Sequence, residues 1–109
     1  MPGDTLTREH VLGNVDEIPV GEGRNFEVAG RTVAVFRNHA GEVFASQADC
    51  PHLGGPLADG MLGGSTIMCP LHDRMFDLRT GSVLVGECGI TVYPIRKAED
   101  GTLLLSLDG

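Results

Sequence analysis

The sequence predicts an all-β protein, built as a sandwich-like stack of short antiparallel sheets. Two observations support this fold class. Apolar residues alternate over short runs, as where Val33 and Val35 alternate with Ala34 and Phe36, and turn signals separate these runs, with 16 glycines in 109 residues. No helix-length amphipathic run is present. The length and the 41% hydrophobic content suit one compact domain, which we expect to span residues 1–109.

In the first half of the chain we expect four short strands, two of which pair as a hairpin. Residues 8–12 form the first strand, and the segment VDEIPVGEG is turn-like because Pro19, Gly21 and Gly23 interrupt any regular element. Two runs, Phe26–Val28 and Thr32–Arg37, then pair as a hairpin, and residues 42–47 return as the next strand.

In the second half, short strands alternate with loops. The expected strands are residues 65–68, 75–78, 90–97 and 102–107. Pro94 interrupts the third of these runs, which indicates a sheet edge or a bulge.

Charge and cysteine content exclude several function classes. The net charge is −7, with 15 acidic and 8 basic residues, so phosphate repulsion argues against a nucleic-acid partner. No apolar run reaches the length of a membrane span, and the N-terminal segment MPGDTLTREH lacks the apolar region of a signal peptide. If two of the three cysteines bind metal, no pair remains for a disulfide, and we expect a cytoplasmic protein.

The main motif places one cysteine and one histidine on each of two short arms. The first arm is Cys50-Pro51-His52, and the second is Cys69-Pro70-Leu71-His72. These four donors could hold one zinc ion tetrahedrally, but zinc fingers usually pair cysteines on one arm and histidines on the other. A cluster of two irons fits mixed arms better, because each arm can then supply one ligand to each iron. The metal is therefore either a two-iron cluster or a zinc ion.

The motif and its surroundings resemble the Rieske family. The segments CPHLGGPLADG and CPLHDRMFDLRTG are similar to the two cluster-binding loops of bacterial Rieske ferredoxins, and IPVGEG and VYPIR also recur in that family. The resemblance implies one [2Fe–2S] cluster, with Cys50 and Cys69 on one iron and His52 and His72 on the other. It also implies a cluster-binding subdomain of roughly residues 48–82 at one end of the sheets.

Departures from the high-potential members of the family indicate a low reduction potential. Gly55 and Leu71 occupy the positions of a disulfide that links the loops in those members, and Arg74 and Phe76 replace two hydroxyl residues. Asp73 follows the second histidine, where it either tolerates the loop conformation or lowers the potential by its charge.

Residues outside the motif receive structural roles. We expect Cys88 to pack in the interior without binding metal, and His10 and His39 to lie at a strand edge and a turn tip. Four apolar residues of the loops could form a docking rim: Leu53, Pro56, Leu57 and Leu71.

The resemblance implies a one-electron carrier with no catalytic residues of its own. It would be the ferredoxin of a Rieske non-haem iron oxygenase system, which receives electrons from a flavin-dependent reductase and passes them to the terminal oxygenase. The alternative is the Rieske-like small subunit of an NAD(P)H-dependent nitrite reductase, whose partner is the large subunit.

Overall fold

The protein is a stack of three small antiparallel sheets. The computed structural model describes residues 9–51, 54–70 and 74–107, and within them the chain forms eleven strands and two single-turn 3-10 helices. The helical turns are η2 (Val15–Glu17) and η3 (Leu57–Asp59). No helix in the described part of the chain is long and apolar enough to cross a membrane. The all-β architecture confirms the predicted fold class.

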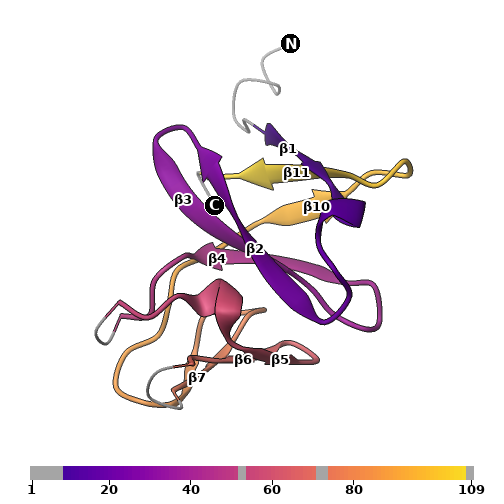
Figure 1. The fold of residues 1–109 in the computed structure, drawn as a ribbon. Helices are drawn as coiled ribbons and strands as arrows, with labels where there is room; N and C mark the ends of the chain where they lie inside the picture. The colour runs from indigo at the N-terminus through magenta and orange to yellow at the C-terminus, as the bar shows by residue number, and fades with distance from the viewer. Residues whose placement is uncertain (1–8, 52–53, 71–73, 108–109) are drawn as a thin grey trace.

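The sheets form three layers, which are visible from top to bottom in Figure 1. The first layer has the order β1 (Glu9–Asn14), β11 (Thr102–Ser106) and β10 (Ile95–Lys97). The middle layer has the order β2 (Glu22–Val28), β3 (Arg31–Arg37), β4 (Val43–Gln47) and β9 (Val92–Tyr93). The third layer has the order β5 (Met61–Gly63), β6 (Thr66–Met68), β7 (Met75–Asp77) and β8 (Val83–Val85).

Strand β3 contributes to both hydrophobic cores. Its residues Val33 to Phe36 are all 0% exposed, so both faces of the strand are covered. Val33 and Val35 face the first layer in an aliphatic core, which comprises Val15, Ile18, Val28, Val33, Val35, Ala45, Leu103 and Leu105. Ala34 and Phe36 face the third layer in an aromatic core, which comprises Ala34, Phe36, Phe44, Cys50, Leu57, Ile67, Cys69, Phe76, Leu78 and Ile90.

The prediction that Gly23 breaks the chain was wrong, because Gly23 lies inside β2. Its cross-strand partner is Phe36, and a Cβ atom at this glycine would lie 2.7 Å from the phenylalanine ring. The missing side chain therefore allows β2 to pair closely with β3 over the ring of Phe36. Here glycine serves packing rather than a turn.

The predicted strand over residues 90–97 is divided between two layers. Tyr93 pairs with Ala45 in the middle layer, whereas Ile95 pairs with Leu105 in the first layer. Pro94, which lacks an amide hydrogen, lies at the crossing, and its carbonyl accepts a 2.9 Å hydrogen bond from the Ser106 amide. The interruption at Pro94 was predicted, but the change of sheet was not.

Candidate metal centre

The first loop leaves β4 and returns to η3. An isolated bridge joins Asp49 to Pro56 across its base. Inside it, the amide of Cys50 donates to the Gly55 carbonyl at 2.7 Å, and the amide of Gly54 donates to the Cys50 carbonyl at 3.0 Å. Gly54 has a φ of +69°, a backbone conformation that favours glycine. The loop therefore holds Cys50 by its backbone from both sides.

The second loop connects β6 to β7. The strands pair from Thr66 with Asp77 up to Met68 with Met75, and one further hydrogen bond, of 2.7 Å, runs from the Cys69 amide to the Arg74 carbonyl. Cys69 therefore lies at the base of a closed hairpin loop. The hairpin sets its position through pairing in the third layer.

Both cysteines of the motif belong to the aromatic core. Cys50 is 2% exposed and Cys69 is 0% exposed. The structure thus brings together two sulfur donors that are nineteen positions apart in the sequence, at the ends of two closed loops. The other two predicted donors, His52 and His72, lie outside the described residues, as do Leu53, Leu71 and Asp73.

The donor chemistry of the described residues fits a thiolate-bound metal group. Two cysteines buried in an apolar cluster are suitable ligands for iron or zinc, because thiolates bind both. Among the described residues there is no competing group of three or more histidine, cysteine or acidic side chains. The assignment of Cys50, His52, Cys69 and His72 as the complete ligand set remains a prediction.

A small cleft lies beside the two loops. Its lining consists of Pro51 from the first loop and Arg74, Phe76, Glu87 and Cys88. The nearest distance between the Arg74 and Glu87 side chains is 3.9 Å, and the buried Nε of Arg74 has no hydrogen-bond partner within the described structure. Sequence reasoning missed Glu87, since nothing in the motif indicates that this segment reaches the loops.

Two further predictions need correction. Cys88 is exposed, so it does not pack in the interior as expected. Leu57 is 0% exposed and part of the aromatic core, so it cannot contribute to a docking rim, whereas Pro56 is exposed. The loop leucine turned inward because η3 packs against the middle layer. His39 is exposed at its turn, as predicted.

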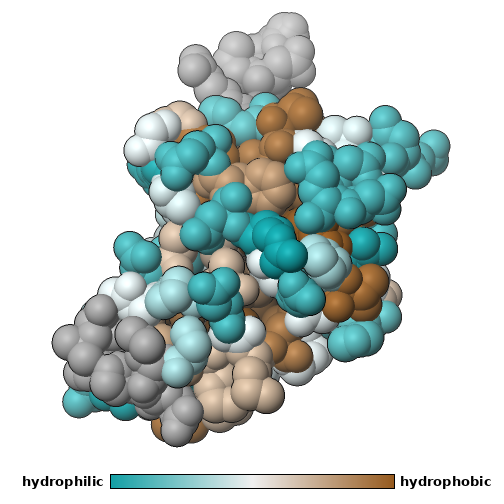
Figure 2. All heavy atoms as spheres, in the orientation of Figure 1, coloured by the Kyte–Doolittle hydropathy of each residue, from teal (hydrophilic) through white to brown (hydrophobic). Residues whose placement is uncertain are grey.

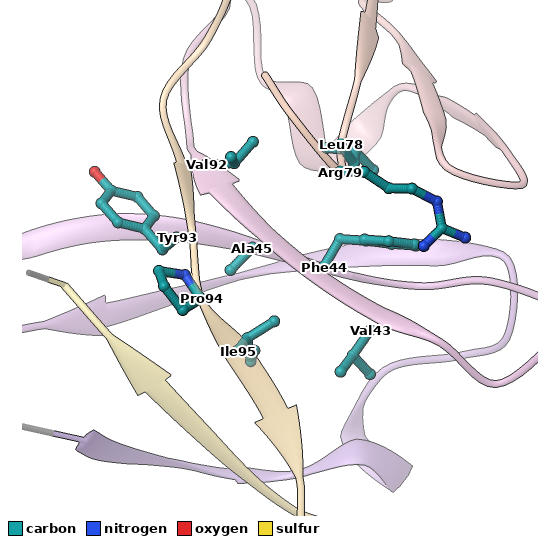
Figure 3. Close-up of a pocket in the computed structure, with 9 residues that line it drawn as sticks. All are labelled: Val43, Phe44, Ala45, Leu78, Arg79, Val92, Tyr93, Pro94 and Ile95. Carbon is teal, nitrogen blue, oxygen red and sulfur yellow. The ribbon is translucent and has the colours of Figure 1, made fainter. Parts of the chain in front are cut away.

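A separate groove of about 380 Å³ lies at the edge of β4, where β9 leads into β10 (Figure 3). Its lining is Val43, Phe44, Ala45, Leu78, Arg79, Val92, Tyr93, Pro94 and Ile95. The one charged lining side chain, Arg79, already binds Glu42 through two hydrogen bonds of 2.9 and 3.0 Å and lies 5.4 Å from the Phe44 ring centroid. This lining offers no nucleophile with an adjacent base.

Comparison with known proteins identifies relatives over most of the chain. The ferredoxin subunit of a biphenyl dioxygenase from Pseudomonas is 41% identical over 86 residues, which are 76% of this chain and 78% of that protein. The ferredoxin component of naphthalene 1,2-dioxygenase/salicylate 5-hydroxylase systems from Ralstonia is 33% identical over 96 residues, which are 86% of this chain and 90% of that protein.

Solved structures share the fold. The Sphingomonas yanoikuyae B1 ferredoxin matches with a TM-score of 0.79 at 29% identity, over 91% of this chain and 98% of that chain. A protein from Mycobacterium tuberculosis described as an NADH-dependent nitrite reductase small subunit matches with a TM-score of 0.84, over 92% of this chain and 95% of that chain. Its identity is only 24%, so this match shows likeness of fold alone.

The family is established by a model that spans most of the sequence. The model of the Rieske [2Fe-2S] domain matches residues 8–94, a range that contains both arms of the cysteine–histidine motif, β1 to β9 and the whole third layer. The resemblance found in the sequence is thereby confirmed, and the chain belongs to the Rieske [2Fe-2S] domain family.

Proposed function

We propose that this protein is the ferredoxin component of a Rieske non-haem iron oxygenase system. It receives one electron from a flavin-dependent reductase and passes it to the terminal oxygenase. The observation that carries the proposal is that dioxygenase ferredoxins at 33% and 41% identity match this chain over most of their own length.

The chain's own residues would hold and shield the cofactor. We propose that Cys50 and Cys69 bind one iron and that His52 and His72 bind the other. When bound, the cluster would supply one-electron transfer. Leu57, Ile67 and Phe76 pack around the buried cysteines and exclude water from that side, while the hydrogen bonds at the loop bases hold the backbone of both cysteines in place. In this arrangement a subdomain of roughly residues 48–82, which contains both loops, carries the cofactor. The first and middle layers support this subdomain.

A carrier without catalytic residues is consistent with the described surface. The groove beside β4 holds Arg79 in an ion pair and offers no nucleophile with a base, and nothing in its lining indicates a substrate site. If two of the three cysteines are ligands, no cysteine pair remains for a disulfide. We therefore propose that the protein acts in the cytoplasm.

A second candidate is the small subunit of an NAD(P)H-dependent nitrite reductase. It stays an alternative because a mycobacterial protein described as such a subunit shares the fold of this chain, with a TM-score of 0.84. In that role the protein would be a permanent subunit bound to the large subunit rather than a diffusing carrier.

Reconstitution tests the proposal. The purified protein is combined with an NADH-dependent flavin reductase and with a terminal Rieske non-haem iron oxygenase, and oxygen consumption is measured together with hydroxylated product. We expect product formation that depends on this protein and saturates with its concentration. A stable complex with a sirohaem nitrite reductase, together with failure to reduce the oxygenase, would instead support the second candidate.

A further inference from the structure

All three methionines of the described chain lie in one cross-strand row. Met61 pairs with Met68, Met68 pairs with Met75, and Met75 pairs with Val85, so the four side chains follow each other across β5, β6, β7 and β8. The sequence has four methionines in total, and the fourth is Met1. We call Met61, Met68, Met75 and Val85 the methionine row.

The row occupies the outer face of the third layer. Successive residues of a strand point to opposite faces, and the neighbouring residues Ile67 and Phe76 are buried in the aromatic core. The row therefore points away from that core. It borders a hollow of about 310 Å³ lined by Met61, Leu62, Gly63, Thr66, Met68 and Met75.

This face is unusually apolar for an exposed surface. Met61 is 71% exposed and Val85 is 49% exposed, so two of the five large exposed hydrophobic residues in the described structure belong to the row. In Figure 2, pale brown atoms gather at the lower end of the molecule, over the third layer. Of the other three, Val11 and Val20 belong to other parts of the fold, and Leu84 precedes Val85 on β8 and points to the opposite face. A cluster of this kind indicates contact with another protein.

The row adjoins the loop that carries Cys69. Met68 directly precedes Cys69, and Met75 directly follows Arg74, whose carbonyl binds the Cys69 amide. An electron leaves a protein-bound cofactor only over a short distance, so a redox partner must cover this end of the molecule. A partner positioned there also meets the methionine row.

The charges of the segment that contains the row describe the partner further. Between residues 48 and 90, the described chain carries four carboxylates, Asp49, Asp59, Asp77 and Glu87, against two guanidinium groups, Arg74 and Arg79. The chain as a whole has a net charge of −7. A complementary surface is therefore apolar at its centre and basic at its rim.

We propose that the methionine row is a docking surface for a redox partner protein whose contact patch is apolar and ringed by basic side chains. This inference rests on the proposed function, because only an electron carrier needs such a partner. Methionine suits the role, since its unbranched, polarisable side chain adapts to partner surfaces of different shape.

The test compares electron transfer to a protein and to a small molecule. The cluster-loaded protein is reduced chemically and mixed in a stopped-flow instrument with mitochondrial cytochrome c, a basic one-electron acceptor. For the double variant Met61→Gln/Met75→Gln we expect a second-order rate constant about tenfold lower than for the unmodified protein, as for the loss of a central contact. Oxidation by ferricyanide, the reduction potential and the visible spectrum should not change.

Val11→Gln is the matched control, because Val11 is 70% exposed but lies on β1 in the first layer. Its rate with cytochrome c should stay within about twofold of the unmodified protein. If the double variant does not fold, the single variant Met61→Lys is used in its place. Its added charge should slow the reaction with the basic acceptor more than Val11→Lys does.

The outcomes separate this inference from the proposed function. If the unmodified protein reacts with both acceptors and the methionine variants react equally fast, the docking surface is wrong and the carrier function stands. If the variants slow the reactions with cytochrome c and ferricyanide alike, the substitutions disturb the cofactor, and the docking surface is again wrong. If the cluster-loaded unmodified protein reduces neither acceptor, the carrier function itself fails, and the docking surface fails with it.

Discussion

The two hydrophobic cores lie on opposite faces of the middle sheet and differ in composition. The aliphatic core, between the first and middle layers, contains only valine, isoleucine, leucine and alanine. The aromatic core, between the middle and third layers, contains three of the four phenylalanines and both cysteines of the motif. One side of the molecule is a structural base, and the other side surrounds the predicted cofactor.

The strands around the two cores differ as well. β2 and β3, in the middle layer, have seven residues each, whereas every strand of the third layer has three. Strands of three residues bury little area and form few ladder hydrogen bonds, so the third layer needs additional cross-links. Metal binding can supply them, because its free energy adds to the free energy of folding. The long strands that can stabilise the fold without a cofactor therefore lie in one half of the molecule, and the predicted cofactor site lies in the other half.

The largest expected effect is loss of the cofactor from the aromatic core. The unmodified protein, purified without oxygen, should contain two irons and two sulfides per chain and, when reduced, show a rhombic EPR signal. Cys50→Ser and Cys69→Ser should each lose the visible spectrum and lower bound iron by about tenfold or more, since each removes a thiolate ligand. Metal analysis and absorption spectroscopy measure this result.

Cys88→Ala is the control, and it should retain both iron and colour. A folded but colourless Cys88→Ala protein would show that the ligands are misassigned. One zinc per chain without sulfide in the unmodified protein would contradict the cluster altogether.

Core truncations should affect the two halves differently. Leu105→Ala in the aliphatic core should lower the free energy of unfolding by about 2–5 kcal/mol and leave the visible spectrum unchanged. Phe76→Ala in the aromatic core should cost about 3–5 kcal/mol and should also change visible circular dichroism, because Phe76 and both cysteines share one cluster. Chemical denaturation and circular dichroism provide the measurements. If Leu105→Ala disturbs the visible signal as much as Phe76→Ala, the two cores are not functionally separate.

Charges beside the loops should shift the reduction potential by smaller amounts. The unmodified protein should lie toward the negative end of the Rieske range, at roughly −150 mV, because Arg74 and Phe76 stand where high-potential members have hydroxyls. Glu87→Gln should raise the potential and Arg74→Gln should lower it, each on the order of tens of millivolts, since a nearby negative charge opposes the added electron.

Protein-film voltammetry measures these shifts, and Glu99→Gln, in the turn between β10 and β11, is a control that should change little. Shifts of the same sign in Glu87→Gln and Arg74→Gln would contradict the electrostatic account. A strongly positive potential in the unmodified protein would refute the interpretation of Arg74 and Phe76.

The smallest effect concerns a polar link between the middle and third layers. The Asn38 side chain donates to Glu42 at 2.9 Å and to the Gly64 carbonyl at 3.2 Å, and Glu42 also binds Arg79. These bonds from Asn38, and then from Arg79, hold the pKa of Glu42 below its ordinary value. A lowered pKa contributes stability above the pKa of the unfolded state, and that stability is lost as the pH falls through the folded pKa.

Glu42→Gln should therefore lower the thermal midpoint slightly at neutral pH, and the difference from the unmodified protein should shrink in acid. Melting curves from neutral pH to about pH 3 test this. Glu9→Gln is the matched comparison within the first layer. Arg96 likewise lowers the pKa of Glu9, so the stability difference of this variant should have the same sign of pH dependence. A Glu42→Gln difference that grows toward low pH would have the wrong sign.

Local sequence pattern was sufficient to predict several strands and the family. The alternation from Val33 to Arg37 predicted β3, and the runs that lead to Cys69 and away from the second loop predicted β6 and β7. The prediction of β3 was confirmed because alternation of apolar residues reports directly on strand conformation. The predictions of β6 and β7, which rested on their position beside the second arm of the motif, were confirmed as well. The spacing of the motif, together with the resemblance that it carries, likewise predicted the family. By contrast, β5 and β8, which have three residues each like β6 and β7, were not predicted, because so short a run carries no period and neither strand adjoins an arm of the motif.

The sequence by itself thus determined the all-β class, the longer strands and the family, and it predicted the ligand set; all of these depend on residues close together in the chain. Only the tertiary structure decided that both faces of β3 are buried, that Leu57 turns inward and Cys88 outward, and that Glu87 reaches Arg74. It also aligned Met61, Met68 and Met75 in one row. The physical reason is that strand periodicity specifies which residues share a face, whereas the layer that covers each face depends on pairings between distant segments.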